Sequence, residues 1–188
     1  EQLKMVWRNA RRLLGLVNQL LDFRKLEVQG IELQKSVSDV VAFVKDIALS
    51  FSDLFASKSI RFSVSSSVEK LNMAFDPDKL EKILFNLLSN AYKYSGERGQ
   101  VDLELKYFNT ESSEPTSVEK PVLRIIVRDS GIGISPEMQE KIFDRFFQSG
   151  KDTSGHSGTG IGLSLTREFV RLHGGDISGQ SSSGHGSE

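Results

Sequence analysis

The chain has 188 residues and a formal net charge of −1 at pH 7; 38% of its residues are hydrophobic and 26% are charged. This length allows one sizeable core with an appendage, and the near-zero charge argues against a nucleic-acid binder that depends on counterion release. The sequence contains no cysteine, which excludes disulfides and thiolate metal sites and is typical of a reducing compartment. Because no apolar run approaches about 18 residues, no membrane span is predicted within it.

Residues 1–27 are predicted to form one helix. Apolar residues recur at alternating steps of three and four, at Leu3, Val6, Ala10, Leu13, Val17 and Leu20, and a second row lies at Trp7, Leu14 and Leu21. This pattern is typical of a coiled coil or helical bundle. The stripe needs a partner, and a second chain is favoured over the chain's own domain because a linker with Gly30, residues 28–37, follows. The helix is already periodic at Glu1, which indicates a fragment of a longer protein.

The main domain is expected to span residues 38–188 and to begin with a helix. Ser36 or Ser38 offers the N-cap, and apolar residues keep helical spacing as far as Ala56. A short strand at residues 31–33 is expected before this helix.

Two short strands are predicted next, at residues 60–64, where apolar and polar side chains alternate, and at residues 71–75. Asp76 and Pro77 then begin a second helix, because an acidic N-cap followed by proline at the first helical position is a helix start. Apolar spacing carries this helix to Tyr94.

The second half of the domain is predicted to contain a hairpin and a last helix. Strands at residues 101–107 and 122–128 are joined by a polar loop, and the helix spans residues 159–173. A Ser/Gly-rich run, residues 181–188, follows. This order of elements predicts an α+β fold: a two-layer α/β sandwich in which a mixed, mostly antiparallel sheet carries about three helices on one face.

Asn86 and Asn90 lie four residues apart, so they share a face of the second helix with Lys93 or Tyr94. An amide oxygen is a hard, neutral ligand that suits Mg²⁺, an ion that retains waters and binds phosphate oxygens of a substrate. Lys93 could balance phosphate charge. Two amides on a helix are more often surface residues or caps, so this pair alone is a weak indication of a site.

Asp129 follows an apolar strand, at a strand end where ligands are often bound. A carboxylate there can accept a hydrogen bond from the exocyclic amine of adenine, and Gly131 and Gly133 allow the backbone to approach a flat base. The simpler interpretation of this segment alone is an Asp-Ser-Gly turn.

Gly158, Gly160 and Gly162 are spaced at every second residue around the predicted start of the last helix. Such a turn presents backbone N–H groups to phosphate. It matches neither the Walker A pattern nor a full dinucleotide-binding fingerprint, so it too is weak evidence alone.

The combination of motifs is much more specific. Four blocks occur in order: Asn-Leu-Leu-Ser-Asn-Ala-Tyr-Lys-Tyr at 86–94, Asp-Ser-Gly-Ile-Gly-Ile at 129–134, Ile-Phe-Asp-Arg-Phe-Phe at 142–147 and Gly-Thr-Gly-Ile-Gly-Leu at 158–163. Together they strongly resemble the catalytic ATP-binding domain of sensor histidine kinases, over about residues 36–188. The first helix resembles the second helix of the family's dimerisation and phosphoacceptor hairpin. Its sequence is similar to that of the corresponding helix in hybrid sensor kinases of Bacteroidetes.

The resemblance implies ATP and Mg²⁺ as ligands and assigns roles by position. Asn90 would be the main Mg²⁺ ligand, with Asn86 assisting. Lys93 and Tyr94 would face the phosphates or ribose, and Asp129 would bind adenine. The further residues implied in ATP binding are Gly131, Ile132, Gly133, Ile134, Arg145, Phe147, Lys151, Gly158, Thr159, Gly160, Ile161, Gly162 and Leu163.

By the same resemblance, residues 144–157 correspond to an ATP lid. Arg145 and Lys151 are its candidate partners for the γ-phosphate, and the following glycine turn would bind the phosphates through backbone N–H groups. Phe146 and Phe147 would anchor the lid by packing on the core.

The family transfers the γ-phosphoryl group to a histidine on the first helix of the hairpin, and then to a response-regulator aspartate. None of His156, His173 and His185 is followed by an acidic residue as the acceptor would be, so the acceptor is expected upstream of Glu1. The family's final strand is also missing after Ser187, which predicts an exposed sheet edge.

The expected partners are a second copy of the chain, through the N-terminal hairpin, and a receiver domain, without nucleic acid. The full-length protein is expected at the cytoplasmic side of the inner membrane, and this fragment is expected to be soluble.

Two other classes remain open. ATPases of the same fold carry a glutamate at the place of Asn86 to activate water, and because an amide cannot act as a general base, phosphoryl transfer is favoured over hydrolysis. A non-catalytic module would be a helical dimer with a degenerate nucleotide pocket, against which the four intact blocks argue.

Overall fold

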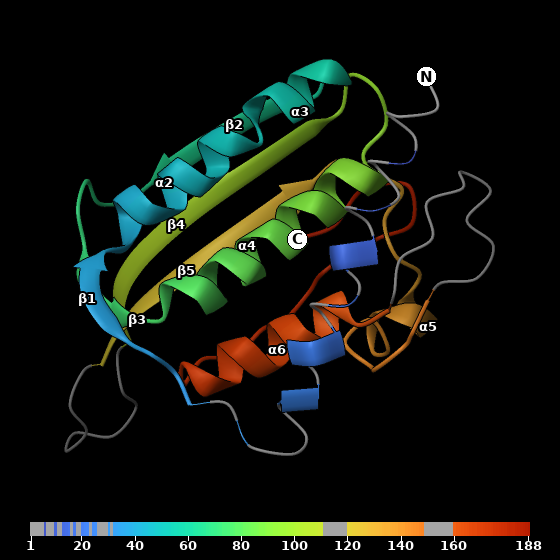
Figure 1. Ribbon diagram of the computed structural model, residues 1–188. Coiled ribbons are helices and arrows are strands. Elements are labelled where there is room, and N and C mark those ends of the chain that lie inside the picture. Colours follow the sequence, from blue (N-terminus) through green and yellow to red (C-terminus); the bar gives the residue numbers. More distant parts are fainter. Residues whose placement is uncertain are drawn as a thin grey trace.

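The computed structural model describes residues 32–110, 120–148 and 160–188, together with separate residues between 6 and 30. In these ranges helices cover one face of a sheet, so the chain forms two layers (Figure 1). The elements are β1 (Ser36–Asp39), α2 (Val40–Ser50), α3 (Ser52–Ser57), β2 (Arg61–Ser66), β3 (Asn72–Phe75), α4 (Pro77–Tyr94), β4 (Gln100–Thr110), β5 (Lys120–Asp129), α5 (Pro136–Gln139) and α6 (Gly162–Leu172). No helix in the described ranges is long and apolar enough to cross a membrane.

A three-stranded mixed sheet forms one layer. β2 pairs parallel to β4, with Phe62 opposite Val101, and β4 pairs antiparallel to β5, with Val101 opposite Asp129. β1 and β3 form a separate antiparallel pair in which Ser36 lies opposite Phe75. The predicted α+β sandwich with a mixed sheet is therefore confirmed.

The first two long helices both begin at an aspartate. At α4, the carboxylate of Asp76 accepts a hydrogen bond from the first turn and Pro77 occupies that turn, as predicted. At α2 the N-cap is Asp39, so the prediction of Ser36 or Ser38 is wrong. β1 keeps the chain extended as far as Asp39, so the helix begins at Val40, and the Asp39 carboxylate accepts hydrogen bonds from the N–H groups of Val41 and Ala42.

Other boundaries differ from the prediction as well. The helix expected to run to Ala56 is divided at Phe51 into α2 and α3. The last helix begins at Gly162, three residues later than expected. The strand expected in the linker is absent at Glu32 and Leu33, and the strand β1 forms just after them because β3 supplies its partner. The short helix α5 was not predicted.

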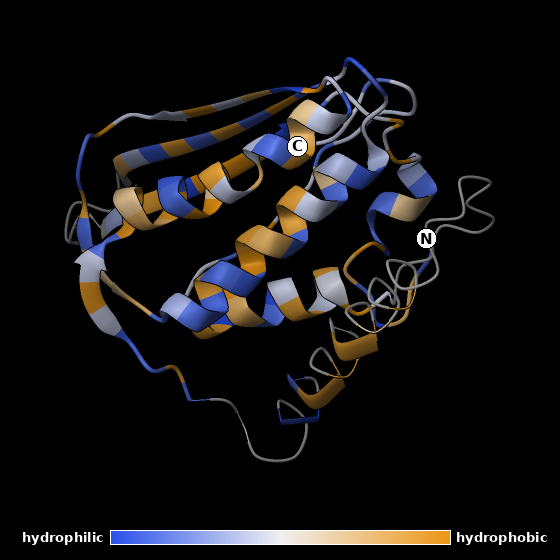
Figure 2. Cartoon of the chain, turned by 45° about the horizontal axis from the view of Figure 1, so that its top comes forward, coloured by the Kyte–Doolittle hydropathy of each residue, from blue (hydrophilic) through white to orange (hydrophobic). Residues whose placement is uncertain are grey.

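The core lies between the helices and the sheet. Along β4, Val101, Leu103 and Leu105 are fully buried, whereas the residues between them are partly exposed, as strand alternation requires. Phe55 of α3 packs on Phe62 of β2, with 4.5 Å between ring centroids. Figure 2 shows that apolar and polar residues also alternate along the helices, as expected for helices with one buried face.

A smaller apolar cluster lies between α4 and α6. Its buried members are Ile83, Ile161, Leu165 and Phe169. Because this cluster holds the first turn of α6 beside the middle of α4, it brings two of the sequence motifs together.

The described residues between 6 and 25 are helical, and their large apolar side chains are exposed. Val6, Leu13, Leu14, Val17, Leu20 and Leu21 are 45–63% exposed. The carboxylate of Asp22 contacts Lys82 Nζ of α4 at 2.7 Å, a partly exposed ion pair that contributes at most roughly 1 kcal/mol. That a second chain covers the apolar stripe stays a prediction.

Candidate functional site

Asn86 of α4 faces the beginning of α6. Its Nδ2 donates a hydrogen bond to Thr166 Oγ1 at 2.8 Å, and Thr166 is buried. A Cβ at Gly162 would overlap Asn86 Oδ1. A side chain at position 162 would therefore force the Asn86 amide or the first turn of α6 to move, since the amide oxygen of Asn86 lies directly against that turn. Asn90, one turn further along α4, is half-buried.

The N-terminus of α6 has no side-chain cap. Its N-cap residue is Ile161, whose side chain makes no cap hydrogen bond, whereas aspartates cap α2 and α4. The N–H groups of Gly162 and Leu163, in the first turn, have no acceptor within the helix. Such a terminus is suited to an anion, because its N–H groups and the helix dipole both favour negative charge.

Gly160 joins this terminus to the first residues of the expected lid. Its φ is +69°, and a Cβ there would lie 2.6 Å from the carbonyl carbon of Phe146. The Phe146 N–H donates to the Gly160 carbonyl at 2.9 Å. The turn that precedes α6 and residue 146 therefore form one contact, made by backbone atoms.

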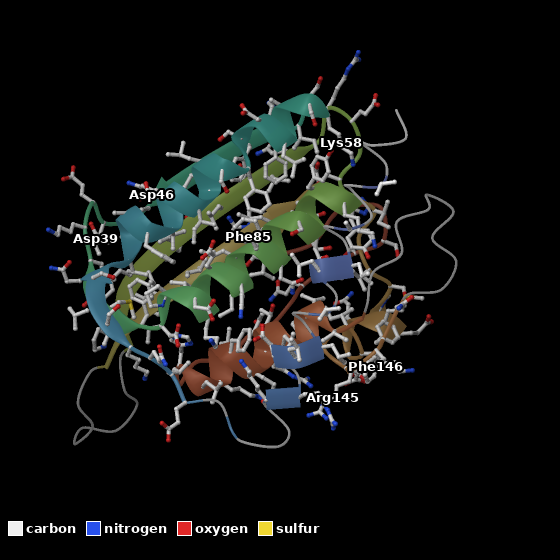
Figure 3. All side chains as sticks on the ribbon, in the orientation of Figure 1. Asp39, Asp46, Lys58, Phe85, Arg145 and Phe146 are labelled. Atoms are coloured by element: carbon white, nitrogen blue, oxygen red, sulfur yellow. The ribbon has the colours of Figure 1, made fainter. Side chains whose placement is uncertain are left out.

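The side chain of Phe146 does not anchor the lid. It is 60% exposed, and Figure 3 shows it at the surface together with Arg145, which is also exposed. The prediction that Phe146 packs on the core is wrong, because its φ of +61° directs the backbone toward Gly160 and leaves the ring outside. Phe147 is half-buried.

Asp129 ends β5 and is half-buried. Its Oδ1 accepts a hydrogen bond from the Gly131 N–H at 2.8 Å. Burial raises the pKa of the Asp129 carboxyl, and hydrogen bonds involving the backbone of Gly131 and Ser187 oppose this only in part. The carboxylate thus has one oxygen held by the loop that follows it.

Tyr94 connects the end of α4 to the loop after Asp129. The Ile132 N–H donates to the Tyr94 carbonyl at 3.3 Å, and a Cβ at Gly131 would overlap that oxygen. Lys93 Nζ donates to the Tyr94 hydroxyl at 2.8 Å and lies 4.4 Å from its ring centroid. Lys93 and Tyr94 therefore form a pair next to the Asp129 loop.

Two of the predicted motifs contact α4 at different points: the beginning of α6 lies against Asn86, and the loop after β5 lies against Tyr94. Lys151, Gly158 and Thr159 lie outside the described residues, as does His156. Within the described residues no group of three or more histidine, aspartate or glutamate side chains could hold a metal ion.

Sequence reasoning missed Ser181 and Gln139, which both contact the Asp129 loop. The Ile134 N–H donates to Ser181 Oγ at 2.8 Å, and Gln139 Nε2 donates to the Ile134 carbonyl at 3.1 Å. A serine in a Ser/Gly-rich run and a glutamine in an unpredicted helix are not distinctive. The available indication was the Gly184-x-Gly186 turn, which predicts a close backbone approach.

The described residues form a two-layer sandwich. It has a carboxylate at a strand end, an amide pair on a helix and a glycine-rich helix start without a side-chain cap. This architecture is typical of a nucleotide-binding domain. The chain belongs to the family of histidine kinase-, DNA gyrase B- and HSP90-like ATPases, whose model matches residues 75–188.

Similarity to individual known proteins defines the class within this family more closely. The chain is 40% identical over 178 residues to the hybrid signal transduction histidine kinase D of Dictyostelium discoideum, covering 94% of this chain and 11% of that protein. It superposes with a TM-score of 0.77 on the crystal structure of full-length ShkA in complex with AMPPNP, at 27% identity, covering 96% of this chain and 35% of that one.

A structure of histidine kinase ThkA in complex with response regulator protein TrrA shares the fold, with a TM-score of 0.69 at 22% identity, over 97% of this chain and 47% of that one. The chain spans only a small part of its curated relatives. Its class is the ATP-binding catalytic domain of sensor histidine kinases.

Proposed function

We propose that this chain binds Mg-ATP and presents the γ-phosphoryl group to a histidine outside these residues, for relay to an aspartate of a response regulator. The observation that carries the proposal is the contact of Asn86 with Gly162 and Thr166. This contact sets the Asn86 amide against the N-terminus of α6, while the Asp129 loop contacts Tyr94 at the end of α4, the helix that also carries Asn90.

Asp129 binds the base in this proposal. Its Oδ1 is held by the Gly131 N–H, so the second oxygen is oriented to accept a hydrogen bond from the exocyclic amine of adenine. Partial burial strengthens such a hydrogen bond, because less water competes for the carboxylate. Guanine has a carbonyl oxygen in place of that amine, so ATP is expected to bind more tightly than GTP.

The phosphates lie at the N-terminus of α6. The proposal is supported by the missing side-chain cap at Ile161 and by the close backbone approach at Gly160, since N–H groups of an uncapped first turn donate to phosphate oxygens. Lys93, Arg145 and Lys151 are the cations that we assign to the phosphate end.

The amide oxygens of Asn90 and Asn86 are the ligands that we assign to Mg²⁺. The hydrogen bond from Asn86 Nδ2 to Thr166 supports this assignment, because it turns the amide oxygen away from Thr166. Two neutral oxygens leave the remaining positions of the ion to water and to phosphate oxygens, as Mg²⁺ prefers. When bound, the ion neutralises charge that develops on the phosphates.

Transfer is favoured over hydrolysis because Asn86 stands where a general base would be needed. An amide cannot take a proton from water, so the reaction depends on placing an imidazole nitrogen in line with the γ-phosphorus. The alternatives are an ATPase, which would hydrolyse ATP without an acceptor, and a non-catalytic dimerisation module, which would not bind Mg-ATP.

The proposal includes two protein partners. Exposure of the apolar residues in the N-terminal helix supports a homodimer through a helical hairpin. A receiver domain, as in the complex of ThkA with TrrA, is the partner that would accept the phosphoryl group.

Labelled phosphoryl transfer tests the proposal. This chain and a longer chain that includes the helix upstream of Glu1 are each incubated with γ-labelled ATP and Mg²⁺. Acid-labile label is expected on a histidine of the longer chain and not on this one. Label on a histidine of this chain would overturn the placement of the acceptor, and label on neither chain would overturn the kinase assignment.

A further inference from the structure

The segment of residues 181–187 holds the outer side of the Asp129 loop. Asp129 and Ser187 exchange both backbone hydrogen bonds, at 2.8 and 3.0 Å, and the Gly184 N–H donates to the Ile132 carbonyl at 2.7 Å. A Cβ at Gly133 would overlap the Ser182 carbonyl, so the two segments touch through their backbones. The loop is thus enclosed between the end of α4 and this segment.

The Ser181 hydroxyl makes three hydrogen bonds where this segment meets the loop. Its oxygen lies 2.8 Å from the Ile134 nitrogen, 2.7 Å from the Gly186 carbonyl oxygen and 3.0 Å from Ser187 Oγ. A serine has one proton to donate and two lone pairs to accept. The Gly186 carbonyl can only accept, so Ser181 donates to it, and Ile134 and Ser187 both donate to Ser181. Every hydrogen-bonding position of this hydroxyl is therefore used.

Gln139 of α5 makes further hydrogen bonds at the same end of the loop. Its Nε2 donates to the Ser181 carbonyl at 2.7 Å and to the Ile134 carbonyl at 3.1 Å. Both polar backbone groups of Ile134 are therefore held by side chains of Ser181 and Gln139. No regular secondary structure holds these groups, since Ile134 lies outside the helices and strands.

We propose that Ser181 is a positioning residue for base recognition: it fixes the far end of the loop whose near end carries Asp129, without itself touching the nucleotide. The inference rests on the proposed function of Asp129. The loop contains Gly131 and Gly133, and glycine provides little stiffness of its own. The orientation of the Asp129 carboxylate, which depends on the Gly131 N–H, is therefore determined by the contacts at both ends of the loop.

The test compares nucleotide affinity in variants of this chain by calorimetry. Ser181→Ala is expected to weaken ATP binding about tenfold, as for a lost hydroxyl that leaves a backbone N–H unsatisfied, with an unchanged number of sites per chain. Inorganic triphosphate, which has no base, is expected to bind both proteins equally. Ser181→Thr, which keeps the hydroxyl, is expected to restore ATP affinity.

Ser183→Ala is the matched control. Ser183 is exposed in the same segment, and among the described residues its hydroxyl makes no hydrogen bond to the loop. Its affinity for ATP is expected to equal that of the unaltered chain. If Ser181→Ala fails to fold, Gln139→Ala replaces it, with the same expected loss of ATP affinity.

The outcomes separate this inference from the function on which it rests. Failure of the unaltered chain to bind ATP would overturn the proposed function. An unaltered ATP affinity in Ser181→Ala, an equal loss in Ser183→Ala, or an equal loss of triphosphate affinity would each overturn the role of Ser181 while the proposed function stands.

Discussion

The Nε2 atom of His173, at the end of α6, accepts a hydrogen bond from the backbone N–H of Asp76, at the start of α4, at 3.1 Å. Nδ1 of the same ring lies 2.7 Å from the Phe169 carbonyl oxygen. Because a carbonyl can only accept, Nδ1 donates to Phe169, while Nε2 accepts from Asp76. Both ring nitrogens of His173 are hydrogen-bonded, so this histidine links the end of α6 to the start of α4. Neither nitrogen is available to receive a phosphoryl group.

Replacing His173 with alanine is expected to lower the free energy of unfolding by about 1–3 kcal/mol, because the N–H of the buried residue Asp76 loses its acceptor. Urea denaturation measures this change. His185→Ala, at an exposed position, is the control and is expected to change stability by less than about 0.5 kcal/mol. Equal losses in the two variants would contradict a structural role for His173.

Asp129→Asn is expected to weaken ATP binding strongly and to increase the stability of the fold at neutral pH. Burial raises the pKa of Asp129 in the native state, so the native carboxyl binds its proton more tightly than the unfolded one. The contribution of Asp129 to the stability of the unaltered chain therefore falls as pH rises from the ordinary value of 3.8 through the raised native value, and this cost persists above it.

Asparagine keeps an oxygen for the Gly131 N–H but carries no charge. The stability of Asp129→Asn relative to the unaltered chain should therefore increase with pH over that interval and then level off. Urea denaturation at several pH values measures the difference. A difference that does not change with pH would contradict the raised pKa.

Gly162→Ala is expected to impair both stability and ATP binding. The added Cβ would overlap Asn86 Oδ1, so either the amide or the first turn of α6 must move, at a cost of about 1–3 kcal/mol. Thermal unfolding and calorimetry report the two effects. Gly96→Ala is the control, because a Cβ at Gly96 meets nothing within 4 Å; similar behaviour of the two variants would contradict the close approach of α4 and α6.

Asn86→Glu is expected to raise the rate of ATP hydrolysis, because it supplies a carboxylate that can act as a general base toward water. Phosphate release is the measurement. Asn86→Ala, which loses the amide without gaining a base, is expected to show no such increase. Unchanged hydrolysis in Asn86→Glu would remove the reason for preferring transfer over hydrolysis.

Features determined by neighbouring residues could be predicted from the sequence. Asp76 and Pro77 start α4 as expected, because an acidic cap and a proline act within one helical turn. Asn86 and Asn90 lie on the helix face that their spacing requires. Four blocks of sequence were enough to identify the fold and the family, because each block has its residue types at fixed spacing; the nucleotide site that they imply stays a prediction.

Features determined by distant residues could not be predicted. The cap of α2 is Asp39 because pairing with β3, which lies far along the chain, keeps β1 extended as far as Asp39 and delays the helix to Val40. The partner of Asn86 is Thr166, eighty residues away. The Ser181 hydroxyl makes three hydrogen bonds in the segment of residues 181–187, whose Ser/Gly-rich composition did not predict them.

Phe146 illustrates the opposite error. A phenylalanine in an aromatic run was expected to be buried, but its φ of +61° allows its backbone to contact Gly160 while the ring stays exposed. A positive φ is uncommon for a residue other than glycine, so apolar patterning alone did not predict it.

The central claim is that Asp129 and the asparagine pair of α4 hold one Mg-ATP. Calorimetric titration of this chain with Mg-ATP tests it most directly, with Asp129→Asn and an EDTA-treated sample as comparisons. The account predicts one ATP per chain, with binding weakened by EDTA and by Asp129→Asn. An absence of binding heat for the unaltered chain, or equal affinity in Asp129→Asn, would contradict it.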